Sequence, residues 1–274
     1  LSYNGGTTNS NIVTGEILEA LTAVKTAVSA NYSAGDRITY ALSLVNTGTA
    51  AITDYTVTDN LGGYTVGANT VYPLAYDAGT VRYYINGVLQ TAPTVTAGPP
   101  LTVTGLTVPA GGSAVLIYET TATPVAPLAT GSSITNTATI TGGGLTTPIT
   151  AQATVETANS AELSISKALS PTTVTENGRI TYTFVISNTG NTEATATGNV
   201  VVTDTFAPIL RNIAVTYNGT AWTEGTNYTY NAATGVFTTL AGQITVPAAT
   251  FMQNTDGTFT VTPGTATLVI TGTV

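Results

Sequence analysis

The stretch "DRITYALSLVNTG" (residues 36–48) returns 142 residues further along the chain as "GRITYTFVISNTG" (residues 178–190). In the first copy, apolar Ile38, Tyr40, Leu42 and Leu44 alternate with more polar or smaller residues up to an Asn-Thr-Gly turn. Such alternation, in a run rich in Thr, Val, Ile and Tyr, is typical of a half-buried β-strand. A strand and turn that recur at a fixed offset indicate one folding unit present twice.

The repeat extends over most of the chain. "TVTDNL" (56–61) matches "VVTDTF" (201–206), and "VPAGGSAVLIY" (108–118) resembles "VTPGTATLVI" (261–270). Short β-type runs separated by NG, GG and NTG turns are typical of a β-sandwich. We therefore predict an all-β protein with two tandem immunoglobulin-like β-sandwich domains. The expected parts are an N-terminal strand segment at 1–19, a first sandwich at 20–158 and a second at 159–274.

The two copies differ at their ends. The first closes with "SSITNTATITGGGLTTPITAQATVET" (132–157), which reads as two strands and a glycine-rich hairpin, whereas the second reaches Val274 without one. Residues 1–15 carry a matching pattern ahead of the first copy. We expect them to act as a donor strand for another subunit. The side chains expected to insert are Tyr3, Ile12, Val13 and Ile17.

A second explanation of these ends stays open. The chain begins with Leu rather than Met, and we expect it to be a processed or trimmed part of a longer protein. In that case the missing hairpin follows Val274 in the parent chain, and no strand is exchanged.

The run "GDRITYALSLVNTGTAAITDYTVTDNL" (35–61), with "ITNTATITG" (134–142) after it, resembles a repeat domain of bacterial cell-surface proteins whose function is unknown. The resemblance covers most of the first copy and residues 162–206 of the second, where Gly178 replaces Asp36. It implies an immunoglobulin-like fold and an extracellular location on a bacterial surface. It implies no particular ligand.

Composition excludes several classes of function. Of 274 residues only 7% are charged, and the net charge is −8 with no basic cluster, which argues against nucleic-acid binding. The chain has no His and no Cys, so the usual general base and thiolate are absent. No apolar run approaches the roughly 18 residues of a membrane span. We predict no enzymatic activity, no catalytic residue, no cofactor, no metal site and no membrane insertion.

The only two lysines, Lys25 and Lys167, occupy equivalent positions in the two copies. Each alternates with apolar residues, so both are expected on the inward face of a strand. An unpaired inward ammonium group costs several kcal/mol or loses its proton. Three outcomes stay open: the side chain reaches water, pairs with a buried carboxylate, or is consumed in a covalent bond.

The sequence contains residues suited to the third outcome. Gram-positive surface domains of immunoglobulin-like fold often join a first-strand Lys to a last-strand Asn by an isopeptide bond, although the repeat family that this chain resembles is not defined by such a bond. Asn136 alternates with Ile134, Ala138 and Ile140, so it is expected to face inward in the last strands of the first copy. The hypothesis is a bond between Lys25 and Asn136. Asp59 or Glu119 would be the assisting acid, and Lys167 with Asp204 would be a second reactive pair.

Two further features have alternative interpretations. The lone Trp222 is a candidate for stacking on a sugar, although packing is the commoner role of aromatic residues on strand faces. In each NTG turn we expect the Asn side chain to bond its own turn and the Gly to supply a positive φ.

The sequence thus predicts a structural subunit of a bacterial extracellular filament or surface stalk, with copies of itself as the partner in a head-to-tail polymer. An adhesin or carbohydrate-binding module, with an unidentified glycan or host ligand, is the alternative. A glycosidase domain is the third choice.

Overall fold

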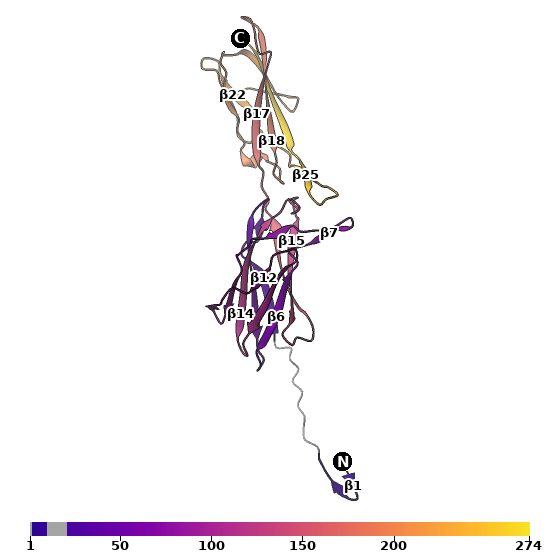
Figure 1. The fold of residues 1–274 in the computed structure, drawn as a ribbon. Coiled ribbons are helices and arrows are strands. Elements are labelled where there is room, and N and C mark those ends of the chain that lie inside the picture. Colours follow the sequence, from indigo (N-terminus) through magenta and orange to yellow (C-terminus); the bar gives the residue numbers. More distant parts are fainter. Residues whose placement is uncertain (1, 10–20) are drawn as a thin grey trace.

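The computed structural model describes residues 2–9 and 21–274. Apart from one three-residue 3-10 turn, the regular elements described there are β-strands, so the all-β prediction is confirmed. Two sandwiches follow one another along an elongated molecule, and an N-terminal hairpin of β1 (Ser2–Tyr3) and β2 (Gly6–Thr7) lies apart from them (Figure 1). Of the expected donor residues, Tyr3 is 80% exposed in this hairpin. Ile12, Val13 and Ile17 lie outside the described residues.

The first sheet of the first sandwich is built around β5, the strand of the stretch quoted above. Ile38, Tyr40, Leu42 and Leu44 are buried on its inner face, as the alternation predicts. The strand order is β11-β10-β14-β5-β3, and β9 also pairs with β14. The bounds are β3 (Leu21–Ala27), β5 (Arg37–Asn46), β9 (Leu74–Tyr76), β10 (Arg82–Ile85), β11 (Val88–Leu89) and β14 (Ser113–Ala122).

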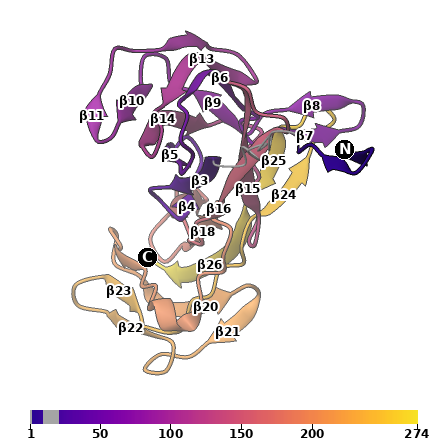
Figure 2. The ribbon, with the colours of Figure 1, turned by 90° about the horizontal axis from the view of Figure 1, so that it is seen from below.

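The facing sheet contains the closing strands predicted at 132–157. Its order is β12-β13-β6-β15-β16-β4, with β4 parallel to the end of β16. Figure 2 shows β5 and β14 in one sheet and β6 and β15 in the other. The bounds are β4 (Asn31–Tyr32), β6 (Ile52–Asp59), β12 (Thr94–Thr96), β13 (Leu101–Val108), β15 (Ser133–Gly142) and β16 (Ile149–Thr157). A separate hairpin consists of β7 (Tyr64–Val66) and β8 (Asn69–Val71).

The second sandwich repeats the plan of β3, β5 and β14 in its first sheet, with the order β17-β18-β26-β20-β21. A three-stranded sheet, β19-β23-β22, faces it across a core that contains Phe206 and Phe237. The bounds of the first sheet are β17 (Leu163–Ser170), β18 (Arg179–Asn188), β20 (Arg211–Tyr217), β21 (Thr220–Trp222) and β26 (Gly264–Thr273). The others are η1 (Ala196–Gly198), β19 (Thr203–Thr205), β22 (Tyr228–Asn231), β23 (Val236–Thr239), β24 (Thr250–Gln253) and β25 (Phe259–Thr262).

Strand β17 is exposed along its whole length, which differs from the sequence prediction. Leu163, Ile165 and Leu169, expected to face inward with Lys167, are 39%, 54% and 37% exposed. The reason lies in the opposite sheet. In the first sandwich β16 packs against β3, whereas the described part of the second sandwich holds no counterpart of β15 and β16. The inward face of β17 is therefore present without the strands that cover such a face.

The glycines of the two NTG turns correct another expectation. Neither Gly48 nor Gly190 has a positive φ, so that part of the prediction is wrong. Gly190 is instead required by close packing, because a Cβ there would collide with the carbonyl oxygen of Ser160 and lie 2.6 Å from the amide nitrogen of Glu162. The turn glycine thus lets the segment that joins the two sandwiches pass directly over it.

Candidate cross-linking site

Lys25 is buried in the first sandwich, as its position on β3 predicts. Its side chain is 0% exposed and that of Asp59, at the end of β6 in the opposite sheet, is 1% exposed. Lys25 Nζ lies 2.5 Å from Asp59 Oδ2. The pair therefore joins the two sheets through the core, and the role of Asp59 as the assisting acid stays a prediction.

Two tyrosines surround this pair. The Tyr118 hydroxyl donates a short hydrogen bond to the same Asp59 oxygen, and the Leu61 N–H donates to the other at 2.9 Å. Lys25 Nζ lies 4.9 Å from the ring centroid of Tyr40 and 5.8 Å from that of Tyr118. Aromatic faces attract a cation at such distances. The ammonium group is therefore held by one carboxylate and two rings in a site shielded from water.

Asn136 completes the cluster from β15. Ala138 is the register partner of Asp59, and Asn136, two residues earlier, faces the same side of the sheet. The residue is 0% exposed, and its side-chain Oδ1 and Nδ2 have no hydrogen-bond partner. A buried polar group left without a partner costs roughly 1–3 kcal/mol. Among the described residues, the hydroxyls of Tyr40 and Tyr55 are the other buried side-chain groups without a partner. A buried amide that lacks partners for both of its polar atoms requires an explanation.

The pKa values connect these groups. Burial raises the pKa of both Tyr40 and Tyr118, the charge of Asp59 raises it further, and the neighbouring Asn136 amide opposes the rise. Asn136 thus lies beside both phenols, although no hydrogen bond of normal geometry forms. Burial lowers the pKa of Lys25 from 10.5 to about 8, against the opposing effect of Asp59. A lysine with this pKa is a neutral amine, and so a nucleophile, in a substantial fraction of molecules at mildly alkaline pH.

Glu119, the other acid considered, lies elsewhere. It follows the inward-facing Tyr118 on β14, so the alternation of the strand turns it to the outer face. There it forms an ion pair with Arg37, with 3.3 Å between Oε2 and Nη1, and its side chain is 34% exposed. Glu119 is therefore not the acid beside Lys25.

The second sandwich contains a matching pair. Lys167 Nζ lies 2.5 Å from Asp204 Oδ2 and 4.6 Å from the ring centroid of Tyr182. The Lys167 side chain, however, is 39% exposed. Among the described residues nothing occupies the place that Asn136 holds in the first sandwich, because β15 has no counterpart there.

Trp222, the candidate for sugar stacking, packs within the second sandwich. Trp222 stacks on Tyr217, with ring centroids 4.8 Å apart, and packs against the second core. Sugar binding at Trp222 stays a prediction. Within residues 2–9 and 21–274, no three acidic side chains gather as a metal site, and no helix has the length and hydropathy to span a membrane.

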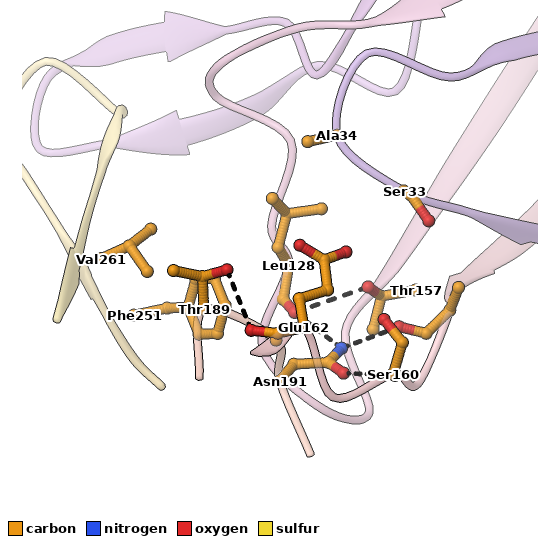
Figure 3. Close-up of a pocket in the computed structure, with 12 residues that line it drawn as sticks. Ser33, Ala34, Leu128, Thr157, Ser160, Glu162, Thr189, Asn191, Phe251 and Val261 are labelled. Carbon is orange, nitrogen blue, oxygen red and sulfur yellow. Dashed lines mark hydrogen bonds between the residues drawn. The ribbon is translucent and has the colours of Figure 1, made fainter. Parts of the chain in front are cut away.

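The sequence did not predict how the two sandwiches are joined. The joint, as we call it, consists of Asn191 and the backbone of Leu128, Ala158 and Ser160. Asn191 Nδ2 donates to the carbonyl oxygens of Leu128 (3.0 Å) and Ala158 (2.8 Å), and its Oδ1 accepts from the Ser160 N–H (3.0 Å). A cavity of about 290 Å³ opens beside these bonds, where Figure 3 shows Leu128 and Phe251 at its wall. Its wall is mostly apolar and holds one carboxylate, Glu162, so we assign it no chemistry.

Comparisons with known proteins yield neither a matching family model nor a matching curated protein. Solved structures do show similarity. BcpA, the major pilin subunit of Bacillus cereus, is 14% identical, with a TM-score of 0.36 over 90% of this chain and 66% of that one. The pilus backbone RrgB of Streptococcus pneumoniae is 11% identical, with a TM-score of 0.36 over 89% and 55%.

The N-terminal domain of a Streptococcus gordonii adhesin is 16% identical, with a TM-score of 0.38 over 51% of this chain and 33% of that one. The similarity to this adhesin domain thus spans a third of the length of the adhesin chain.

Proposed function

We propose that the chain is a structural subunit of a bacterial extracellular filament or surface stalk, and that Lys25 and Asn136 form an isopeptide bond inside its first sandwich. One observation carries the proposal. A buried lysine with a lowered pKa, a buried acid and a buried amide without partners share one dry core. An isopeptide bond accounts for the three groups together. It removes the charge of Lys25, and it converts the unpartnered side-chain amide of Asn136 into the amide that links the two side chains.

The reaction needs no group from outside the chain. A proton passes from Lys25 to Asp59, which leaves a neutral amine beside a neutral acid. Nζ attacks Cγ of Asn136, an Nζ–Cγ bond forms, the Cγ–Nδ2 bond breaks, and the nitrogen leaves as ammonia. The Asp59 carboxyl gives its proton to the departing nitrogen and takes the second proton from Nζ. The products are ammonia, an amide with one Nζ–H and a protonated Asp59, so protons and charge balance. Tyr118, which donates to Asp59, orients the carboxyl for both transfers.

The mass of the intact protein tests the bond. The folded chain should weigh one ammonia less than its sequence, and digestion should give one branched peptide that contains both Lys25 and Asn136. The loss of ammonia should disappear in three variants, so that each has the mass calculated from its own sequence: Lys25→Ala, Asn136→Ala and Asp59→Ala. Asn188→Asp, which changes another wholly buried asparagine, is the matched control and should leave the loss of ammonia unchanged. A full sequence mass in folded wild-type protein would exclude the bond.

Head-to-tail assembly by strand donation is the second part of the proposal. Two features support it: the exposed inner face of β17, and an N-terminal hairpin whose described residues 3–9 are exposed. Exposed strand edges and faces recruit strands from other chains. A contact of this kind does not close on itself, so it generates a fibre. Electron micrographs of the native material should show filaments, and deleting residues 1–15 should leave monomers. Filaments formed by that truncated chain would contradict strand donation.

A further inference from the structure

The second sandwich carries a hairpin, β24–β25, at a place where the first sandwich has a short loop. In the first copy this loop is the run "PAGG" (109–112), whereas the second copy has residues 247–264 in its place. The two loops are equivalent, because Asn46 and Asn188 each donate to the carbonyl oxygen of the proline that begins the loop. The β24–β25 hairpin is therefore an insertion in the second copy.

The first sandwich has an insertion of its own, the β7–β8 hairpin. It lies between Leu61 and the Asn-Gly turn at 86–87, whereas the second copy runs from the matching Phe206 to the matching turn at 218–219 by a shorter path. Figures 1 and 2 show both hairpins on the same side of the molecule, where the two sandwiches meet. The segments in which the copies differ thus lie next to each other.

The β24–β25 hairpin reaches the base of β7–β8. Gln253 Nε2 donates to the Tyr64 hydroxyl at 2.8 Å, and that hydroxyl donates to the carbonyl oxygen of Val125 at 2.6 Å. In the turn of β24–β25, Gly257 lies so close to Val71 at the end of β8 that an added Cβ would be 2.7 Å from Val71 Cγ1. One polar and one apolar contact therefore tie the second sandwich to the first at this point.

One face of β24–β25 is turned toward the first sandwich. The side chains on that face are Phe251, Gln253, Phe259 and Val261, which pair across the hairpin as Phe251 with Val261 and Gln253 with Phe259. The first of these pairs lines the cavity of about 290 Å³ at the joint (Figure 3), and the second lines another of about 550 Å³ together with Tyr64. Two cavities leave this face loosely packed, so the contacts at the base of β7–β8 carry the attachment.

We propose that the two hairpins, residues 64–71 and 250–262, form a clasp that fixes the angle between the two sandwiches. Domains of one chain move relative to each other unless a sufficient interface holds them. The bonds of Asn191 attach the sandwiches at the joint, and the clasp attaches them at a second point. Two separate attachments oppose the bending that one attachment permits. The clasp needs neither a polymer nor a cross-link, so it goes beyond the proposed function and does not rest on it.

The spread of distances between the sandwiches tests the clasp. The chain has no cysteine, so Gln152→Cys and Thr229→Cys, at exposed positions of β16 and β22, provide the only two sites for nitroxide labels. Double electron–electron resonance on this labelled chain should give one narrow distance distribution. Replacing residues 248–263 by Ala-Gly, as in the loop of the first copy, removes the hairpin. The distribution should then broaden about twofold, because the joint alone holds the sandwiches.

A smaller change tests the contacts themselves. Val71→Ala combined with Gln253→Ala keeps both hairpins but weakens both contacts, and it should also broaden the distribution. Met252→Ala is the matched control and should keep the distribution narrow, because Met252 lies on the outer face of the same hairpin and is 66% exposed. Circular dichroism shows which variants are folded, and if the shortened chain is not, the double variant decides. A broad distribution in the labelled chain without these changes, or a narrow one in either folded variant, overturns the clasp.

Discussion

Asn46 and Asn188 hold the same turn in the two sandwiches through the same hydrogen bonds. Asn46 Nδ2 donates to the carbonyl oxygens of Ala50 (2.8 Å) and Pro109 (3.1 Å), and its Oδ1 accepts from the Gly48 N–H (2.9 Å). The bonds of Asn188 go to Thr192 (2.8 Å), Pro247 (3.0 Å) and Gly190 (2.9 Å). Each side chain therefore joins its own turn to a second loop at the same end of its sandwich.

Replacing Asn46 by Ala should lower the free energy of unfolding of the first sandwich by about 3 kcal/mol, because several buried partners lose their bonds at once. Urea titration followed by tyrosine fluorescence measures the change. Asn69→Ala, at an exposed asparagine in β8, is the control and should change the stability by less than about 0.5 kcal/mol. Equal effects of the two substitutions would show that the turn bonds contribute no stability.

Replacing Asn136 by Leu should change the free energy of unfolding in opposite directions, depending on whether the isopeptide bond forms in the wild type. If the isopeptide bond forms, its loss opens a loop of about 110 residues and should lower the free energy of unfolding by about 4–5 kcal/mol, by analogy with a disulfide. If no bond forms, an apolar side chain replaces an unsatisfied buried amide, and the stability should rise. We expect the decrease in urea titrations, and an increase would contradict the bond.

The stability of the Asn136→Leu variant should depend on pH where that of the wild type does not. Its Lys25 is free, with a folded pKa of about 8 against 10.5 for an ordinary lysine. Between these values the unfolded chain binds more protons, so stability rises with pH, by about 1.5 kcal/mol from pH 8 to pH 9.5. The wild-type amide does not titrate and should show no such rise.

Measurements should stop near pH 9.5, because the buried tyrosines act in the opposite sense. Burial raises the pKa of Tyr40 above its ordinary 10, so its contribution to stability is lost as the pH rises beyond 10. A wild-type curve that rises in parallel with the variant between pH 8 and 9.5 would mean that Lys25 is free in both.

Gly190→Ala should destabilise the second sandwich by about 2 kcal/mol or displace the joint, because the new Cβ collides with backbone atoms of Ser160 and Glu162. Urea titration measures the first effect and small-angle X-ray scattering the second. Gly198→Ala is the matched control, since its Cβ would meet no atom within 4 Å. If both variants match the wild type in stability and in scattering, the close packing at Gly190 contributes neither to the stability of the second sandwich nor to the arrangement of the two sandwiches.

Strand periodicity in the sequence predicts most of the fold and part of the candidate site. Alternation correctly predicted that Lys25 and Asn136 face inward. The recurrence of Asp59 as Asp204 pointed to the two carboxylates that lie beside the lysines. Glu119 was kept as a candidate although it directly follows Tyr118, and neighbours in a strand face opposite sides. The pairing of Asp59 with Ala138 joins strands about 80 residues apart, so no local pattern reveals it.

The exposure of Lys167 depends on something that periodicity does not contain. Alternation says which face a side chain is on, but not whether another sheet covers that face. The same limit explains why the joint at Asn191 was missed, since its bonds reach residues 33 and 63 positions away.

The position of the Lys25 site has a mechanical consequence. The chain of the first sandwich runs from Leu21 to Thr157, and β3 and β15 belong to opposite sheets. With Nζ and Cγ joined, tension along the molecule would pass from β3 into β15 without loading residues 26–135. Fully extended, those residues hold roughly 370 Å of contour length. A sandwich locked in this way would transmit a pull to the rest of a fibre as an almost inextensible link.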